Sequence, residues 1–283
     1  MLKPKQYILI GLVAILMVVL YSLDIKGLVK PKENRGMQAT ASADGQAASA
    51  VVTAKSVSDV AKQMINVNLA ADIEKIENQL KGASGDEVLK LNEELAKKWD
   101  DVNQPAPAGF AYEAIAEAQP SYEHWLIAGD RFTDGYQNFR DTTATLGLVN
   151  KAIDAYNKAL QLNPNSLEAK TGLGVAYVTG TQNPMQGIQL LLGVVKEDPK
   201  NVKANMSLGL FSMKSGQFDK AVNRFKTVIA EKPTPEAWFY LATSYENLGM
   251  KPEAILAYQK SKELAADPSL SDFVDRKIKE LNK

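Results

Sequence analysis

Residues that could do chemistry are few in this chain of 283 residues. His124 is its one histidine, and cysteine is absent. A single imidazole cannot build a histidine-based metal cluster, and His124 has no thiol to activate as a general base. We therefore expect His124 at a surface or in a turn. The sequence predicts no catalytic residue and no metal ligand.

The remaining candidates for chemistry have simpler interpretations. The acidic pairs Glu93-Glu94 and Asp100-Asp101 fall in charged helical segments, where a solvated face is expected. Gly172 and Gly174 do not belong to a phosphate-binding loop, and the chain has no GxxxxGK[ST] or HExxH motif. We predict that the protein is not an enzyme, needs no cofactor and takes no small-molecule substrate.

The charge balance bears on the class of partner. Lysine plus arginine and aspartate plus glutamate both total 33, and 45% of the residues are hydrophobic. A neutral chain without a basic stripe argues against nucleic acid as a partner. The hydrophobic fraction is sufficient for a packed core.

An uncharged apolar run, residues 7–23, follows a short N-terminal tail, residues 1–6. As a helix it would span roughly 26 Å, just short of a ~30 Å bilayer core, with Tyr7 and Tyr21 near the two interfaces. We interpret it as an uncleaved transmembrane signal-anchor that contacts the lipid bilayer. A cleaved signal peptide is the alternative, although the nearest small-x-small site, Ala41-Ser42-Ala43, lies far downstream.

Residues 24–55 are rich in alanine, serine and glycine toward their end and lack a helical stripe, which predicts a flexible tether. Lysines flank the apolar run on both sides, so the positive-inside count leans only slightly toward a cytoplasmic body. The sequence thus leaves the membrane orientation open.

The first helix of the body is predicted over residues 56–82, with Ser56 opening a cap-like pattern and Gly82 to Gly85 ending it. Its apolar stripe comprises Val60, Met64, Val67, Leu69, Ile73, Ile76 and Leu80. This helix is expected either to cap a folded array or to pair with a second copy of itself as a homo-oligomer.

A sequence period organises the remainder of the chain. Gly174 recurs as Gly209 after 35 residues, and Pro199 recurs as Pro233 after 34. A period in the mid-thirties is typical of helical-hairpin solenoids.

The repeated residues resemble the tetratricopeptide repeat (TPR) family. The pattern is carried by Trp238, Leu241, Ala242, Tyr245, Gly249, Ala254 and Tyr258, and again by Trp125, Gly129, Phe132, Ala152, Tyr156, Ala159 and Pro164. The resemblance implies an all-α fold, a right-handed superhelical TPR solenoid of antiparallel helix hairpins preceded by one transmembrane helix. Five repeats would cover residues 89–268, with bounds 89–122, 122–166, 167–201, 202–234 and 235–268.

Small residues are expected where two helices approach closely, and aromatic residues between one hairpin and the next. These repeat-packing positions are Gly129, Ala152, Gly174, Gly209, Ala221, Ala242, Ala254, Tyr156, Phe225 and Tyr258. The second repeat carries an insertion within 133–150, either a lengthened hairpin or a longer loop. Residues 269–283 are predicted to form a C-terminal capping helix with Phe273, Ile278 and Leu281 apolar.

In the family resembled, the first helices of successive repeats line a concave groove that binds partners. The resemblance places in this groove Val175, Val178, Met206, Leu210, Met213, Phe239 and Thr243. From the earlier repeats it adds Lys90, Glu93, Lys97, Asp100, Glu123, Leu126 and Asp130. The groove is therefore expected to be charged in its first half and apolar in its second, which suits a peptide or an amphipathic helix. The alternative is that Met206 and Leu210 belong to the core, with the register shifted by one residue.

The layout as a whole resembles bacterial inner-membrane TPR proteins that face the periplasm. It implies a single-pass scaffold that binds another protein within an envelope assembly or secretion complex. Three alternatives stay open: a holdase for periplasmic clients, a cytoplasm-facing import or assembly receptor, and a structural protein that self-assembles through residues 56–82.

Overall fold

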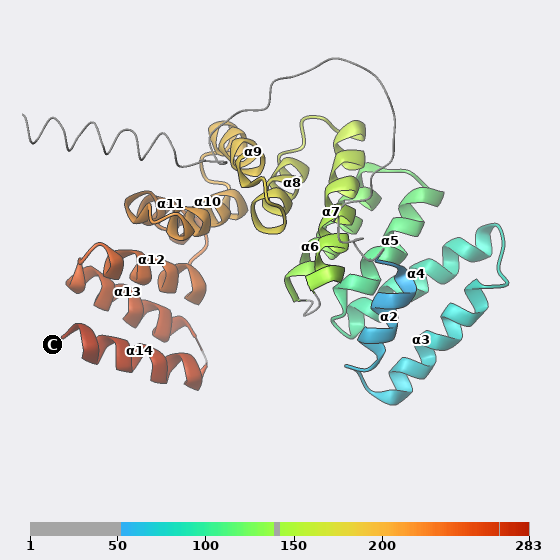
Figure 1. Cartoon of the computed structure of the whole chain (residues 1–283), viewed down its shortest axis with the longest axis horizontal. Helices are drawn as coiled ribbons and strands as arrows, with labels where there is room; N and C mark the ends of the chain where they lie inside the picture. The colour runs from blue at the N-terminus through green and yellow to red at the C-terminus, as the bar shows by residue number, and fades with distance from the viewer. Residues whose placement is uncertain (1–51, 139–141, 266, 283) are drawn as a thin grey trace, which may run out of the picture. The chain divides into compact units, whose positions relative to one another are not determined.

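A computed structural model of the chain describes residues 52–138, 142–265 and 267–282 (Figure 1). These ranges contain thirteen helices and no strand. The helices are α2 (Ala54–Lys62), α3 (Val67–Leu80), α4 (Asp86–Asp101), α5 (Pro105–Ala118), α6 (Tyr122–Asn138), α7 (Thr142–Leu162), α8 (Leu167–Gly180), α9 (Pro184–Glu197), α10 (Val202–Lys214), α11 (Phe218–Glu231), α12 (Pro235–Asn247), α13 (Lys251–Leu264) and α14 (Pro268–Leu281). None of them is long and apolar enough to cross a membrane. The predicted anchor, residues 7–23, lies outside the described residues.

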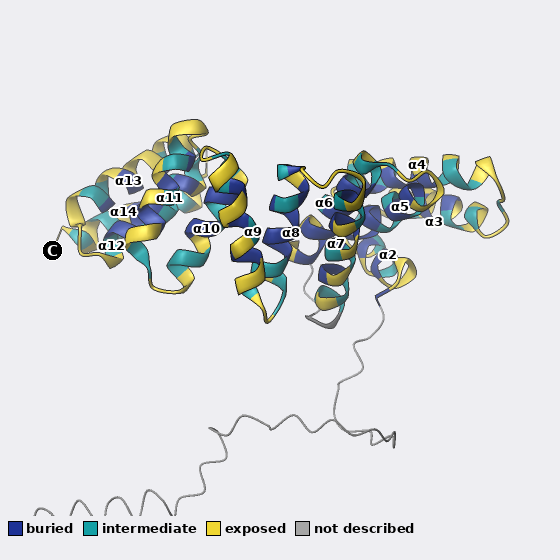
Figure 2. Cartoon of the chain, turned by 90° about the horizontal axis from the view of Figure 1, so that it is seen from above, coloured by how far each residue is buried: buried dark blue, intermediate teal, exposed yellow. Residues whose placement is uncertain are grey.

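Helices pack mainly against their neighbours in the chain. α4 pairs with α5, α6 with α7, α8 with α9, α10 with α11 and α12 with α13. The first helices of successive pairs also meet, since α8 contacts both α6 and α10, and α10 contacts α12. Figure 2 shows buried residues where helices face one another and exposed residues on their outer sides. The predicted all-α array of helix hairpins is confirmed for the described residues, whereas its superhelical hand stays a prediction.

Side-chain caps start the first helix of three successive pairs at equivalent positions. Ser166, Asn201 and Thr234 each accept a hydrogen bond from the backbone N–H three residues later, in α8, α10 and α12 respectively. Such caps satisfy an N–H group that the helix leaves unpaired. The repeat is therefore visible in the capping residues as well as in the apolar positions.

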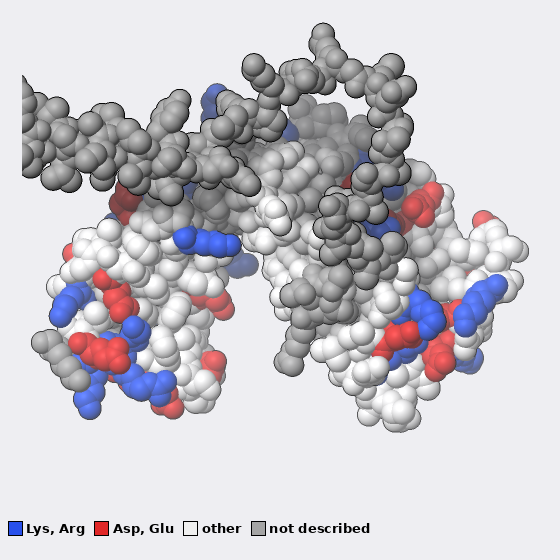
Figure 3. All heavy atoms as spheres, viewed as in Figure 1, with Lys and Arg blue, Asp and Glu red and all other residues white. Residues whose placement is uncertain are grey.

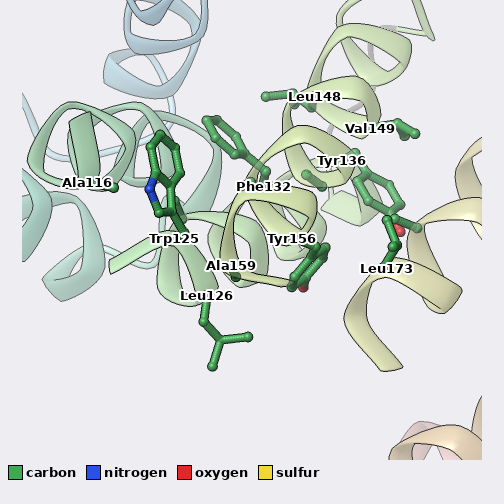
Figure 4. Packing of buried hydrophobic residues seen from close by; sticks show 14 of the residues in the cluster. Ala116, Trp125, Leu126, Phe132, Tyr136, Leu148, Val149, Tyr156, Ala159 and Leu173 are labelled. Atoms are coloured by element: carbon green, nitrogen blue, oxygen red, sulfur yellow. The ribbon is translucent and has the colours of Figure 1, made fainter. Parts of the chain in front are cut away.

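The core consists of aromatic side chains set against small residues. All ten repeat-packing positions named above are buried. A Cβ atom on Gly129 would lie 2.8 Å from the ring of Tyr156, and one on Gly209 would lie 2.6 Å from the ring of Phe225. Figure 4 shows Trp125, Phe132 and Tyr156 pointing between neighbouring helices. Each glycine thus leaves room for an aromatic ring of the following helix.

The N-terminal part of the body differs from the expectation of a single helix over 56–82. The chain forms α2 and α3, because Asn66 caps α3 by accepting a hydrogen bond from the N–H of Asn68. The cap of α2 is Thr53, with Ser56 completing a capping box, and not Ser56 itself.

The break between α2 and α3 divides the predicted apolar stripe. Ile73 and Ile76 are buried in a cluster with Leu95 and Trp99, whereas four other members are exposed. The exposed members are Val60, Met64, Val67 and Leu69. Even one straight helix would not have kept all of them on one face, because Ile73 and Ile76 would lie about half a turn around the helix from Val60 and Met64.

In the second helix pair, α6 and α7, the extra residues lengthen the two helices. α6 has 17 residues and α7 has 21, against 14 in each of α8 and α9. Residues 139–141, between α6 and α7, lie outside the described part.

Helix α14 docks on the last hairpin through Val274, which is fully buried, and through Leu270, Ile278 and Leu281, whereas Phe273 stays partly exposed. Two ion pairs assist the docking: Lys262 to Asp275 at 2.6 Å and Lys277 to Glu246 at 2.9 Å. Val274 was missed in the sequence because the apolar positions Phe273, Ile278 and Leu281 already supplied an amphipathic pattern.

We expect Gly187→Ala to lower the free energy of unfolding by about 1–3 kcal/mol. The new Cβ atom would lie 2.3 Å from the carbonyl oxygen of Gly174, a backbone atom that cannot rotate away. Gly193→Ala on the same helix is the matched control, because nothing lies within 4 Å of its Cβ position. That control should be neutral or stabilising by about 0.5–1 kcal/mol. Urea denaturation followed by circular dichroism measures both, and equal stabilities for the two variants would contradict the proposed close approach.

A pH dependence follows from Glu246, whose carboxylate accepts hydrogen bonds from Tyr258 at 2.7 Å and Lys277 at 2.9 Å. Burial alone would raise the pKa of Glu246, but these two hydrogen bonds outweigh it and hold the pKa below its ordinary value. The stabilisation is therefore present above the pKa of an unfolded glutamate and is lost as the pH falls through the lowered value.

Melting temperatures measured from about pH 7 to about pH 3 test this dependence. The difference between the unmodified chain and Glu246→Gln should shrink as the pH falls. Glu236→Gln, an exposed position on the same helix, should track the unmodified chain throughout.

Candidate functional site

The first helices of three successive pairs, α6, α8 and α10, line a groove with a cavity of about 680 Å³. Its apolar lining comes from α8 and α10, and includes Val175, Val178, Met206, Leu210 and Phe211. Val175 lies deepest, with 6% of its surface exposed, whereas Leu210 stands at the edge with 38% exposed. The groove thus has a buried apolar floor and an apolar lip that solvent reaches.

The structure brings together four of the seven groove positions expected from the later repeats, namely Val175, Val178, Met206 and Leu210. Met213, Phe239 and Thr243 do not line this cavity. Met213 and Phe239 pack against the C-terminal core cluster.

Phe239 and Thr243 are engaged in that C-terminal core by identified contacts. The Phe239 ring lies 5.6 Å from the ring of Tyr258 and 5.8 Å from that of Phe273 on α14. The Thr243 hydroxyl donates to the carbonyl oxygen of Phe239 at 3.0 Å. Helix α14 thus contacts Phe239, a side chain that was expected to face a bound partner.

Charged side chains link the helices beside the groove. Arg131 on α6 donates to both carboxylate oxygens of Asp100 on α4, at 2.7 and 3.1 Å. Asp130 on α6 accepts from the hydroxyl of Tyr156 at 2.7 Å and from Lys203 on α10 at 3.2 Å. The last contact joins helices of the second and fourth pairs, past α8.

The cavity itself has an acidic side and a basic side. Asp134 on α6 lines one edge, and partial burial together with the nearby carboxylate of Asp130 raises its pKa. Lys203, Lys214 and Lys232 line the groove from α10 and from the end of α11. An occupant with opposite charges at its two edges would fit this polarity.

The charged positions expected from the earlier repeats lie away from this cavity. These are Lys90, Glu93, Lys97, Asp100, Glu123, Leu126 and Asp130, none of which lines it. Asp100 and Asp130 form the ion pairs described above, and Leu126 is buried. Figure 3 shows acidic and basic side chains intermixed over α12–α14 and over α2–α4, as expected for a neutral chain.

The sequence interpretation missed the contribution of α6 beyond Asp130. Thr133, Asp134 and Gln137 line the groove there, one helical turn and two turns past Asp130. The spacing i, i+3, i+4 and i+7 on one helix was the available signal. It was overlooked because these residues fall within the insertion assigned to 133–150.

His124 lies in the first turn of α6, where its Nδ1 atom is 2.7 Å from the carbonyl oxygen of Gln119. It does not line the groove. Within the described ranges, no group of three or more His, Cys, Asp or Glu side chains is placed to hold a metal ion.

Two profiles of the tetratricopeptide repeat match the chain, one over residues 143–166 and the other over residues 212–270. Both matches coincide with helices of the hairpins described above. These two segments of the chain are tetratricopeptide repeats. The matched segments include the aromatic residues Tyr156, Phe225 and Tyr258 of the core.

Individual TPR proteins are similar over part of the chain. The BBSome complex member BBS4 of Bos taurus is 31% identical over 106 residues, or 37% of this chain. The match spans only 19% of the length of that relative. A crystal structure of the MamA protein is 25% identical, with a TM-score of 0.46, over 63% of this chain and 92% of the other. MamA from Desulfovibrio magneticus RS-1 is 20% identical, with a TM-score of 0.48, over 64% and 97% of the two chains.

Two substitutions test whether Val175 forms the buried floor of the groove and Leu210 its exposed lip. We expect Val175→Asp to lower the free energy of unfolding by more than about 2 kcal/mol, because it buries a charge in the TPR core. Leu210→Asp should change it by less than about 0.5 kcal/mol, because Leu210 is at the lip. Thermal denaturation monitored by circular dichroism measures both changes. A large loss at Leu210 would mean that this side chain is part of the core.

Proposed function

We propose that this TPR protein is a scaffold without catalytic activity that binds an amphipathic segment of another protein in the groove of α6, α8 and α10. One observation carries the proposal: Val178, Met206 and Leu210 form an apolar strip that remains accessible between an acidic and a basic edge. Methionine and leucine side chains adapt their shape to an apolar partner. TPR proteins commonly bind proteins, and the relative BBS4 is by name a member of a complex.

The polarity of the groove suggests how such a segment would lie. Its apolar face would cover Val178 and Met206, since burial of apolar surface supplies most of the affinity. A basic residue at one edge would approach Asp134, and an acidic residue at the other would approach Lys214. Complementary charges of this kind select register and direction more than they raise affinity.

A membrane location is the second part of the proposal. The apolar run of residues 7–23 would anchor the chain in a bacterial inner membrane, with the TPR body in the periplasm as part of an envelope assembly or secretion complex. The length of the run and the alanine- and serine-rich tether that follows support this placement.

Site-specific photo-crosslinking of the full chain in its native cells tests the groove. We expect one dominant adduct from probes at Met206 and Leu210, and none from Glu168, an exposed position on α8 that does not line the groove. Leu210→Asp should abolish capture at Met206. The control Leu162→Asp, at a more exposed leucine outside the groove, should leave it unchanged.

Other crosslinking patterns would point elsewhere. A spread of many weak adducts would indicate a holdase, and no adduct at either groove position would reject the groove as a binding site. Protease digestion of intact spheroplasts tests the location independently, because a periplasmic body would be cleaved whereas a cytoplasm-facing receptor would be protected.

Self-association is a second candidate, favoured by the apolar residues that α2 and the start of α3 expose. Met64 and Val67 are 65% and 75% exposed. Light scattering of the purified full chain in detergent, compared with a Met64→Lys, Val67→Lys double variant, tests it. A concentration-dependent increase in mass that the double variant lacks would support self-assembly through this surface.

A further inference from the structure

A second cavity, of about 430 Å³, lies between α9 and α11 over the outer side of α10. Leu208 and Ser212 line it from α10, whereas Met206 and Leu210 line the inner groove. Residues two positions apart on a helix point in nearly opposite directions, so the two grooves lie on opposite sides of α10. Phe211 borders both. We call the second cavity the outer groove.

Apolar side chains cover one wall of the outer groove and extend beyond it. Ile188 and Leu208 are buried at its base, whereas Met185 and Leu192 are 56% and 45% exposed. Met185, Ile188 and Leu192 follow the spacing i, i+3, i+7 on α9, so they form a stripe about two helical turns long. A stripe of this length exceeds what a small ligand in the cavity would cover, and it matches the apolar face of a helix.

The opposite wall carries two cations, Lys220 and Arg224 on α11, and no carboxylate lines the cavity. In the described part of the chain, neither cation forms an ion pair with an acidic side chain. The Lys220 side chain donates a hydrogen bond to Gln217. The Arg224 side chain donates one from Nη1 to Oδ1 of Asn205 at 2.9 Å. The guanidinium has five N–H donors, so most of its hydrogen-bonding capacity is available.

Buried hydrogen bonds hold the Arg224 side chain in place. Asn205 is 1% exposed and donates through Nδ2 to the carbonyl oxygens of Pro199 and Asn201, both at 2.9 Å. These bonds orient the Asn205 amide, whose oxygen then accepts from the guanidinium. The fold thus positions a cation beside an apolar wall without supplying its counter-charge.

Arg131 offers a comparison within the same chain. A hydrogen bond from Arg131 to Asp100 raises the pKa of its guanidinium, whereas burial lowers that of Arg224. A partly buried cation loses part of its hydration. Without an anionic partner, little of the lost stabilisation is replaced. A carboxylate brought by a partner would replace the lost hydration, and arginine binds carboxylates in a bidentate manner.

We propose that the outer groove binds an amphipathic helix of a partner protein, with its apolar face on α9 and a glutamate or aspartate at its edge paired with Arg224. Charge complementarity selects the acidic residue, and the stripe on α9 selects the helix. This site is distinct from the inner groove, with which it shares only Phe211.

The test uses the purified full chain in detergent and three fluorescein-labelled peptides that differ at one position. Each is a 16-residue helix with a leucine face, and the position at the edge of that face is Glu, Gln or Lys. We expect the Glu peptide to bind, with an affinity at least tenfold above that of the Gln peptide by fluorescence anisotropy. Arg224→Gln should remove this difference, and Arg224→Glu should make the Lys peptide the tighter ligand.

Matched variants identify the groove that is occupied. Leu192→Asp, at an exposed position away from Arg224, should abolish binding of all three peptides. Leu210→Asp and Lys214→Gln, which alter only the inner groove, should leave the preference for Glu unchanged. Far-UV circular dichroism confirms that each variant is folded. Arg224→Lys keeps the positive charge and should retain a preference for Glu, and Arg224→Glu still tests the charge if Arg224→Gln is unstable.

Several results would overturn the proposal. These are equal affinities for the Glu and Gln peptides, no binding of the Glu peptide, or a preference for Glu that survives Arg224→Gln. Binding that Leu210→Asp abolishes and Leu192→Asp leaves intact would reject the outer groove and support the inner one. A failure of the inner groove alone would leave the preference for Glu intact.

Discussion

The structure depends on how closely its helices approach one another within each hairpin. In α8 and α9 this approach is nearly backbone to backbone, because a side chain on Gly187 would meet the carbonyl oxygen of Gly174. In the α6–α7 and α10–α11 pairs a glycine faces an aromatic ring, with Gly129 against Tyr156 and Gly209 against Phe225. Dense packing of this kind leaves little freedom in the angle between two helices. The positions of α6, α8 and α10 relative to one another follow from it.

The same packing explains why binding surfaces form on both sides of α10. The interior is built from small residues and aromatic rings, so some apolar residues of intermediate size stay accessible. Leu192 is exposed, and Met206 lines the inner groove while it also packs against the C-terminal core cluster. Alternate positions along α10 face opposite sides, where the neighbouring first helices line one groove and the second helices α9 and α11 line the other. A hairpin array thus produces two kinds of surface from one repeat.

Much of this architecture could be predicted from the sequence, because it depends on local periodicity. The recurrence of Gly174 as Gly209 marks hairpins whose contacts lie within a few tens of residues. The predictions were wrong where a single polar residue or a distant partner decided the outcome. Asn66 split a predicted helix by capping α3, and α14 took Phe239 into the C-terminal core.

Contacts between residues far apart in the chain could not be predicted from the sequence for a related reason. Lys203 and Asp130 are 73 residues apart and belong to different repeats. Their contact requires the accumulated geometry of the intervening helices, which no period in the sequence specifies. The packing positions therefore follow from the repeat pattern, whereas the charges beside the groove and the contribution of α6 need the folded chain.

The pairing of charges offers a physical criterion for separating structural from binding residues in a neutral chain. Arg131 and Lys203 each neutralise a carboxylate of another helix, so they hold repeats together. Arg224 is held by an equally specific contact, but its acceptor is the neutral amide of Asn205. A fold gains little from positioning a half-buried cation without a counter-charge, because the lost hydration is not recovered. The absence of a carboxylate beside Arg224 is thus better explained by a partner that supplies one than by the stability of the chain itself.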